Sequence, residues 1–427
     1  MNRRGRVGAA VAALVAVLLA FASSALAVTV KVDAKPGALA AALAKARSGD
    51  VLTLEAGIHQ GGLVLAKPVA LQGLPGAVIE GGGEGSVIRV TVPGVSIRDL
   101  TIRKSGIRPV DYDSAIFVEK QAGNFTAERN WLDGNLFGIV LHGADKSVVK
   151  DNRIDNRSDV YDTERGNAIH LWAVDDSLIE GNRASGGRDG VYVEASHGNQ
   201  IKDNHFQKVR FAIHYMFANR GKIIGNRSRG NRIGFALMYS NDLEVRDNVS
   251  IDDEEHGLML HTSHRSLVEG NRIRATREKC VFIYTATSNV IRANRIENCE
   301  LGLHFTGGSE NSVIANNAFV DNRTQVKYTG TVFYEWSEAG RGNYWSDNPA
   351  FDLDGDGTAD AAYRPNTVMD RLVWRYPLAK LLMSSPVMEA LKIAQSHFPA
   401  LMPGGVIDSH PLMAPPPNLA LGTESGS

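Results

Sequence analysis

An asparagine that recurs every 22 or 23 residues constrains the fold of this chain more than any other feature. A short run of β-branched or aliphatic residues precedes each copy. A second such run begins eight or nine residues after it, usually just past a glycine. Fixed periods of this length are typical of solenoids, in which each repeat stacks on the next. The recurring residues are Asn152, Asn182, Asn204, Asn226, Asn248, Asn271, Asn294 and Asn317, at steps of 30, 22, 22, 22, 23, 23 and 23 residues.

The second run alternates between two kinds of side chain, and this alternation identifies its buried face. Its first and third positions are apolar in every copy, apart from the hydroxyl of Tyr215. A period of two places these positions on one face of a strand, which we assign to the interior. We therefore predict an all-β fold, a right-handed parallel β-helix, whose asparagines stack as a structural ladder at one corner. The inward pairs are Ile139/Leu141, Ile169/Leu171, Val191/Val193, Ile213/Tyr215, Phe235/Leu237, Leu258/Leu260, Val281/Ile283 and Leu303/Phe305.

The ends of such a solenoid expose strand edges and need covers. Ala38 to Arg47 is rich in alanine and predicts a helix that caps the N-terminal end of the solenoid, which spans residues 28–375. The longer step after Asn152 predicts that Asn156 to Gly166 loops out, and Ile107 to Asp113 forms a similar excursion. We interpret the two loops as a lip that binds a partner.

Residues 1–27 have the composition of a secretory signal peptide. Arg3, Arg4 and Arg6 precede an apolar run from Val7 to Ala22, and Ala25 to Ala27 supplies a cleavage site of small residues. The paired arginines also permit a twin-arginine signal, which the flanking residues favour less. No other stretch reaches the ~18 consecutive apolar residues of a membrane-spanning helix, so we predict an exported protein. Without these three arginines the chain has 43 basic and 47 acidic residues, which argues against binding to nucleic acid.

Only two cysteines are present, so a scaffold of disulfides cannot hold this chain together. An extended hydrophobic core must do so instead. Cys280 and Cys299 either pair in an oxidising compartment or remain two buried thiols.

The outward positions of the second run form two columns of histidine, methionine and aromatic residues, where a solvated face would carry charges. Residues two apart on a strand share a face, and neighbours on stacked strands lie ~5 Å apart. Thioether and imidazole groups there can converge on one ion, and such neutral ligands suit Cu(I) better than Mg²⁺ or Ca²⁺. The alternative is a ladder that only packs against a partner or stabilises the fold. The predicted copper ligands are His214, Met216, Met238, Met259 and His261. Secondary candidates are His142, His170, Glu194 and His304.

A loop with calcium-binding spacing follows the repeats. Its carboxylates occupy loop positions 1, 3, 5 and 9, with a glycine at position 6, which is the spacing that wraps oxygen ligands around Ca²⁺. Tyr363 stands at position 12, where a bidentate glutamate is expected. We predict a structural Ca²⁺ loop that locks the C-terminal cap, and the alternative is an empty acidic turn. The carboxylates are Asp352, Asp354, Asp356 and Asp360.

The chain changes character near residue 375. Trp374 to Leu382 and Val387 to His397 have a helical pattern with an apolar stripe, and a proline-rich extended stretch completes the tail of residues 376–427. The helices either pack on the last coil or dock on another protein.

These segments together resemble the NosD-type periplasmic proteins that are required for maturation of nitrous oxide reductase. The resemblance covers essentially the whole mature chain. Asparagine repeats alone are shared by many carbohydrate-active β-helices, whereas the His-Tyr-Met and Ala-Leu-Met-Tyr strands are far more specific. The resemblance rests on Gly166–Trp172, Ile213–Phe217, Gly234–Ser240, Gly342–Asp347, Asp352–Asp360, Tyr363–Asn366 and Arg375–Pro377.

The resemblance implies a non-catalytic accessory protein that partners an ABC transporter, made of a permease and an ATPase, at the periplasmic face of the inner membrane. Similar proteins take copper from a membrane-anchored chaperone lipoprotein and help to assemble the copper-sulfide centre of nitrous oxide reductase. His214, Met216 and Met238 fall in the family-like strands, which supports transient binding of Cu(I) there. By the same resemblance, the tail from Leu378 onward is the element that docks on the transporter.

Two other functions are compatible with the predicted fold. A polysaccharide lyase or epimerase needs a basic or phenolic proton acceptor beside groups that neutralise a uronate carboxylate. The outward columns contain Glu119 and Glu194 but no lysine or arginine, which argues against such an enzyme. A plain adhesin or scaffold would have an outer face rich in Thr, Ser and Asn, without the methionine cluster.

Overall fold

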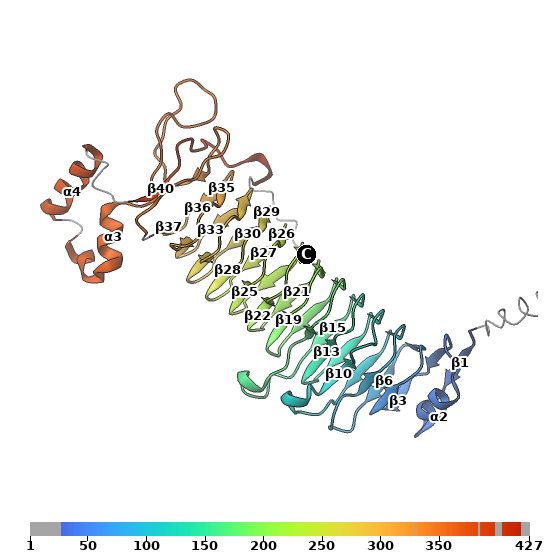
Figure 1. Ribbon diagram of the computed structural model, residues 1–427. Coiled ribbons are helices and arrows are strands. Elements are labelled where there is room, and N and C mark those ends of the chain that lie inside the picture. The colour runs from blue at the N-terminus through green and yellow to red at the C-terminus, as the bar shows by residue number, and fades with distance from the viewer. Residues whose placement is uncertain (1–26, 329, 383–384, 398–403, 420–427) are drawn as a thin grey trace, which may run out of the picture.

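The computed structural model describes residues 27–328, 330–382, 385–397 and 404–419, so the predicted signal peptide lies outside the described residues. Three long parallel sheets wrap around one continuous core, and the predicted parallel β-helix is confirmed (Figure 1). Each regular coil contributes one strand to each sheet. Within the described ranges, no helix has the length and apolar character needed to span a bilayer.

The three sheets are named A, B and C in the order in which a coil visits them. Sheet A comprises β1 (Thr29–Val32), β2 (Val51–Leu54), β5 (Ala70–Gly73), β8 (Ser96–Arg98), β11 (Thr126–Glu128), β14 (Val148–Lys150), β17 (Leu178–Glu180), β20 (Gln200–Lys202), β23 (Lys222–Ile224), β26 (Glu244–Arg246), β29 (Leu267–Glu269), β32 (Val290–Arg292) and β35 (Val313–Ala315). Sheet B comprises β3 (Gly57–Gln60), β6 (Ala77–Glu80), β9 (Thr101–Arg103), β12 (Trp131–Asp133), β15 (Arg153–Asp155), β18 (Arg183–Ser185), β21 (His205–Gln207), β24 (Arg227–Arg229), β27 (Val249–Ile251), β30 (Arg272–Arg274), β33 (Arg295–Glu297), β36 (Ala318–Val320) and β39 (Tyr344–Trp345). Sheet C comprises β4 (Leu63–Leu65), β7 (Ile88–Val90), β10 (Ser114–Val118), β13 (Phe137–His142), β16 (Ile169–Trp172), β19 (Asp189–Glu194), β22 (Phe211–Met216), β25 (Ile233–Met238), β28 (His256–His261), β31 (Lys279–Tyr284), β34 (Leu301–Phe305) and β37 (Thr324–Tyr328).

The predicted inward pairs form the core of sheet C. Residues such as Ile213, Tyr215 and Leu237 are completely or almost completely buried. Parallel register places Ile213 against Val191 on one side and Phe235 on the other. The period of two therefore separates core from outer face correctly along the whole sheet.

The asparagine ladder stands at the corner between sheets A and B. From Asn130 to Asn343, each backbone N–H donates to the side-chain oxygen of the next asparagine at 2.9–3.1 Å. The side-chain amide also donates to a carbonyl of an adjacent coil, as Asn226 does to Ile201 O at 2.8 Å. These bonds satisfy backbone groups that the corner would otherwise leave buried without partners.

From Asn152 to Asn271, the residue before each ladder asparagine alternates between aspartate and glycine for a packing reason. Both residue types adopt left-handed backbone, with φ of 55° at Asp203 and 69° at Gly225. A Cβ at Gly225 would lie 2.2 Å from Asp203 Oδ1. The carboxylate of one coil thus occupies the space above the next corner, and only glycine fits there.

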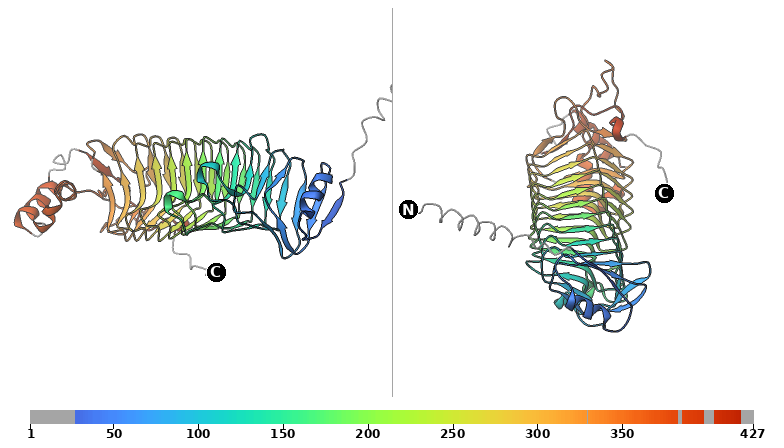
Figure 2. Two further views of the ribbon diagram at one scale, coloured as in Figure 1. Left: turned by 90° about the horizontal axis from the view of Figure 1, so that it is seen from below. Right: turned by 90° about the vertical axis from the view of Figure 1, so that its right-hand side faces the viewer.

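The N-terminal end and one side of the solenoid are covered as the sequence predicts. Helix α2 (Ala38–Lys45) packs on the first coils and buries Leu39. The two longer loops each contain a short helix, η1 (Pro109–Asp111) and η2 (Asp162–Glu164). Figures 1 and 2 show both loops side by side on the same face of the solenoid.

A disulfide joins Cys280 of β31 to Cys299 at the corner before β34, with the two Cα atoms 5.8 Å apart. Of the two alternatives left by the sequence, the structure shows the paired form. The bond links neighbouring coils across 19 residues of sequence.

The C-terminal cap is built from two segments distant in sequence. Strand β38 (Phe333–Glu335) pairs with β40 (Gly405–Ile407), so the chain returns to the solenoid after its helices. Asp408 accepts hydrogen bonds from Asn343 N at 2.7 Å and Trp345 Nε1 at 2.8 Å. The short helix η5 (Pro417–Leu419) follows, and Leu419 O accepts from Arg295 at 2.7 Å. This part of the predicted extended tail therefore belongs to the cap.

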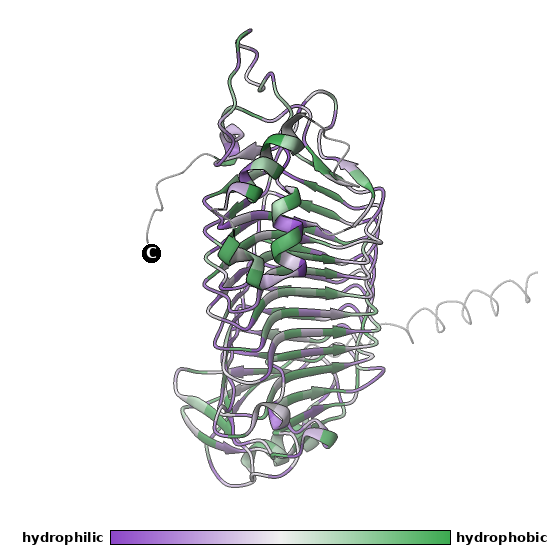
Figure 3. Cartoon of the chain, turned by 90° about the vertical axis from the view of Figure 1, so that its left-hand side faces the viewer, coloured by the Kyte–Doolittle hydropathy of each residue, from purple (hydrophilic) through white to green (hydrophobic). Residues whose placement is uncertain are grey.

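The remaining helices form an arm that projects from the end of the solenoid (Figure 1). The helical arm comprises α3 (Val368–Arg375), η3 (Pro377–Leu382) and α4 (Pro386–His397). It begins at Val368, before the boundary predicted at residue 375. Arg371 anchors α3 by donating to Gly330 O at 2.8 Å and Gly404 O at 2.9 Å. Figure 3 shows apolar segments of the arm on its outer side.

Candidate functional site

Sheet C carries the predicted copper ligands on its outer face. The register stacks Met216 of β22 on Met238 of β25, and Met238 on His261 of β28. Adjacent strands lie ~4.8 Å apart, so the three side chains span two strand spacings with Met238 at the centre. All three are half-buried. We call Met216, Met238 and His261 the outer column.

His214 and Met259 lie in a second, deeper column. The register runs from His214 to Ala236 to Met259, so one alanine separates the two candidate ligands. Each is only 8% exposed. Met259 packs in an apolar cluster with Ile233 and Ala236. The five predicted ligands therefore do not form one cluster, and the structure brings together the outer column.

His214 is held by an ion pair that the sequence analysis missed. Asp189 is fully buried and receives two hydrogen bonds from Arg210, at 2.8 and 2.6 Å. The same carboxylate lies 3.1 Å from His214 Nδ1. The His214 ring stands against Tyr192 and Phe211, each with its ring centre 4.9 Å away.

This arrangement fixes the tautomer of His214. Burial raises the pKa of Asp189, but hydrogen bonds from His214 and Arg210 outweigh it and hold that pKa below its usual value. An ionised carboxylate only accepts hydrogen bonds, so Nδ1 carries the proton. The other ring nitrogen, Nε2, is buried and has no hydrogen-bond partner among the described residues. A carboxylate behind a histidine in this way is a common support for a metal ligand.

His170 is buried on the outer face of sheet C. Its ring lies 5.2 Å from Tyr112 and 5.0 Å from Tyr192, and its Nδ1 is 3.0 Å from the Asn167 side-chain amide. Only 5% of it is exposed. Tyr112, from the loop of residues 107–113, provides the cover, which a strand pattern cannot reveal.

Of the other secondary candidates, only Glu194 is adjacent to the outer column, and His304 lies in the deeper column of Met259. Glu194 is next to Met216 in the register and accepts a hydrogen bond from Tyr192 at 3.0 Å. His304 stacks on Phe282, with ring centres 5.1 Å apart. His142 lies in the register column of Met216, three strands away, with its ring centre 4.2 Å from that of Trp172.

The imidazoles of this face are kept neutral by burial. Desolvation lowers the pKa of His261 and of His142. It lowers the pKa of both His170 and His304 to about 4. Near pH 7 these rings are therefore uncharged, as a metal ligand must be.

Similar proteins decide the family of this chain. A NosD protein of Pseudomonas aeruginosa, described as a probable ABC transporter binding protein, is 41% identical over 377 residues, which cover 85% of this chain and 88% of that protein. The chain belongs to the NosD family. The NosD protein of Stutzerimonas stutzeri, with the same description, is 37% identical over 85% of this chain and 86% of its own length. The family model described as "Periplasmic copper-binding protein (NosD)" matches residues 154–350, which contain the outer column.

Solved structures support the fold of this NosD-family chain and nothing more specific. The A-module of the Azotobacter vinelandii mannuronan C-5 epimerase AlgE6 has a TM-score of 0.52 at 15% identity, over 73% of this chain and 94% of that one. The Dettilon tailspike protein has a TM-score of 0.51 at 13% identity, over 71% of this chain and 66% of its own. An enzyme and a tailspike thus share the architecture.

The sequence contains a pattern that could have identified Arg210, the partner of Asp189. Arg188, Arg210 and Arg232 recur at steps of 22 residues, each directly before a strand of sheet C. These arginines lie at the border of the strands, outside the outward columns, whose continuation into β7 and β37 itself contains Arg89 and Lys327. Arg210 reaches from this border to Asp189 and so to His214.

The predicted calcium loop is only partly assembled. The carboxylates of Asp352, Asp354 and Asp356 lie within 4.8 Å of one another. Asp360 is not in this group, and it accepts a hydrogen bond from Leu353 N at 2.7 Å. The loop is tied to the end of the chain, since Ala359 N donates to Pro411 O and Met413 N to Gly357 O.

Proposed function

We propose that this NosD-family chain is a non-catalytic periplasmic accessory protein that binds Cu(I) transiently at the outer column. In this role it partners an ABC transporter permease and ATPase at the inner membrane. It receives copper from a chaperone lipoprotein and handles copper, sulfur or both for the copper-sulfide centre of nitrous oxide reductase. The register that stacks Met216, Met238 and His261 on three successive strands is the observation that carries the proposal.

The ligand set suits a soft monovalent ion. Two thioethers and one neutral imidazole supply soft donors, which favour Cu(I) over Mg²⁺, Ca²⁺ and Mn²⁺. His214 Nε2 lies on the strand of Met216, two residues away, and is a reserve ligand that Asp189 already orients. A half-buried column on an open sheet also suits transfer, because a partner can reach the ion without unfolding either protein.

The copper proposal is tested by anaerobic Cu(I) titration of the mature protein. Replacement of Met216 and Met238 by leucine and His261 by glutamine is expected to weaken binding about a hundredfold or more. Since burial lowers the pKa of His261, wild-type affinity is expected to hold down to about pH 6.5, where an ordinary imidazole is half protonated.

Met413→Leu is the matched control, because it removes an exposed methionine outside sheet C. It should leave the affinity unchanged. Equal affinity in the triple variant and wild type would remove the outer column as the site. Loss of affinity already at pH 7 would contradict the neutral imidazole.

For the acidic loop we propose a structural Ca²⁺ held by Asp352, Asp354 and Asp356, with Asp360 joining after a change of partner. The tie between this loop and the segment of Pro411 to Met413 supports a role in locking the cap.

A second candidate function is a polysaccharide lyase or epimerase. Tyr192 and His214 lie on the central strands β19 and β22 of sheet C, with Arg210 directly before β22. They combine a phenol, an imidazole and a guanidinium, as proton transfer beside a uronate requires. We expect no unsaturated uronates when the protein is incubated with alginate or pectin. Turnover that is lost in His214→Ala would replace the accessory function.

A further inference from the structure

A cavity of about 380 Å³ lies at the corner between sheets B and C, apart from the outer column. It extends over the corners that precede β19, β22 and β25, and the loop of residues 156–166 forms one wall of it. Its charged lining consists of Arg165, Arg188, Lys208, Arg210, Arg232 and Glu254. The lining is thus predominantly cationic, although the formal net charge of the chain is −1.

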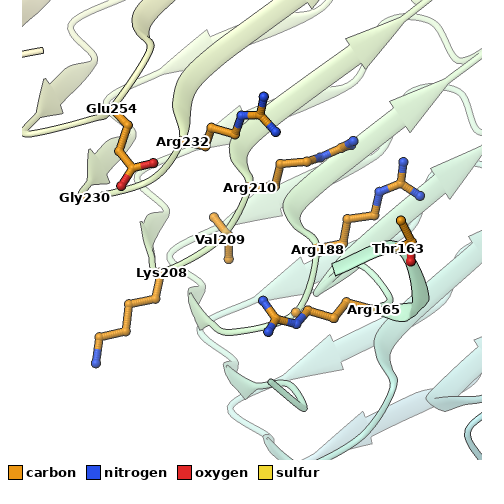
Figure 4. A pocket seen from close by; sticks show the side chains of 10 residues that line it. Thr163, Arg165, Arg188, Lys208, Val209, Arg210, Gly230, Arg232 and Glu254 are labelled. Atoms are coloured by element: carbon orange, nitrogen blue, oxygen red, sulfur yellow. The ribbon is translucent and has the colours of Figure 1, made fainter. Parts of the chain in front are cut away.

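Three of these arginines are stacked by the solenoid itself. Arg188, Arg210 and Arg232 occupy the same position on successive coils, and Arg210 N donates to Arg188 O. Figure 4 shows these three side chains extending in the same direction, while Arg165 reaches across from the loop toward Val209 and Lys208 extends to the opposite side. Like charges on adjacent strands repel each other and destabilise a sheet. The fold thus places several cations close together, and an anion bound between them reduces their electrostatic repulsion.

The cations of the pocket are only partly neutralised. Arg210 is paired with buried Asp189, and Arg232 with Glu255 at 2.7 Å. In the described part of the chain, Arg188 and Lys208 have no carboxylate within ion-pair distance. Both side chains are exposed, so an anion from solvent can reach them. Glu254, on the far side of the pocket, is the only carboxylate among the described lining residues.

We propose that this corner pocket binds a small divalent oxyanion, such as sulfate or phosphate. Guanidinium groups present paired N–H donors that match two oxygens of such an anion, and Lys208, which lines the opposite side of the pocket, adds positive charge. The loop of residues 156–166 closes one side of the pocket. The arginine column extends over only three coils, because Glu255 occupies the equivalent position on the fourth. Both features suit a small ligand better than an extended acidic chain.

The test is isothermal titration of the full mature protein with sodium sulfate and, separately, sodium phosphate, against sodium chloride of matched ionic strength. Wild type should bind the divalent anions with one site per chain and should not bind chloride. The double variant Arg188→Gln, Lys208→Gln should lose about tenfold or more in affinity for both, because it removes the two unpaired cations.

The matched control is Arg183→Gln, Arg227→Gln, which removes two arginines from the outer face of sheet B on the same coils. It should retain wild-type affinity. Equal weakening in both double variants would show a diffuse charge effect and overturn the pocket. Absence of sulfate and phosphate binding by wild type would also overturn it, as would saturable binding of a polyglutamate peptide that sulfate does not displace. The unfolding temperature of each variant, measured in chloride, verifies that the solenoid is intact.

Discussion

Replacing Asn226 by alanine is expected to lower the free energy of unfolding by about 3 to 5 kcal/mol, because Asn226 is an inner member of the ladder. Its side-chain oxygen accepts from Asn204 N at 3.1 Å and from Asn204 Nδ2 at 3.0 Å. Its amide donates to Ile201 O and to Asn248 Oδ1. The substitution leaves the buried Asn204 N–H without its acceptor. Each buried donor without a hydrogen-bond partner lowers the free energy of unfolding by about 1 to 3 kcal/mol. Chemical unfolding followed by circular dichroism measures the change.

The effect should also be visible in how the solenoid unfolds. Each coil contacts only its neighbours, so weakening one junction separates the coils on either side of it. We expect the single unfolding transition of the variant to broaden or split. Gln200→Ala removes an exposed amide from β20, one coil away, and should change the free energy by less than about 0.5 kcal/mol. A loss no larger than that in Asn226→Ala would mean that water replaces the ladder at this corner.

The repeat predicts the fold well because every coil must bury the same backbone groups and fill the same part of the core. Asn226 recurs since each corner buries the same backbone groups, and Ile213 and Leu237 recur since each coil fills the same slice of core. One observed periodicity therefore determines sheets, register and interior together. Even the departures from the period were informative, because the long step after Asn152 marks a real loop.

The site was harder to predict because its geometry depends on contacts between segments without a common period. Alternation indicates that His170 points away from the core, but Tyr112 of a distant loop covers it. Likewise, nothing in the strand pattern of β22 links His214 to Asp189 on the preceding coil. Met259 occupies an outward position and is still buried in an apolar cluster. Periodicity gives the direction of a side chain, whereas depth depends on its neighbours.

The tail illustrates the same difference. Its helical pattern predicts α3 and α4, but not that residues 404–419 return to pack on the solenoid. The return depends on Asp408, whose partners Asn343 and Trp345 lie more than 60 residues earlier. With both ends anchored on the cap, the helical arm is held outward while its own surface stays available.

Replacing Leu378, Leu381 and Leu382 of the helical arm by serine is expected to abolish co-purification with the cognate transporter, while the solenoid stays folded. These side chains are 80%, 83% and 59% exposed and lie together on η3. Large apolar groups exposed in one patch are typical of surfaces that bind a partner. Arg371 and the buried Met369 hold the base of the arm, so the substitutions should not disturb the cap.

The control replaces Ile58, Val64 and Leu353 by serine, which removes three exposed apolar side chains outside the arm and outside the two loops. This variant should co-purify as wild type does, and both variants should unfold at the wild-type temperature. Retention of the transporter by the arm variant would assign docking to another surface. Loss in both variants would show that co-purification depends on exposed apolar surface in general and not on the arm.

Binding of the wild-type protein to lipid vesicles without transporter, lost in the arm variant, would identify the bilayer as the arm's partner instead. Selective loss of the transporter would make the arm the anchor that holds the outer column at the membrane, within reach of whatever delivers its copper.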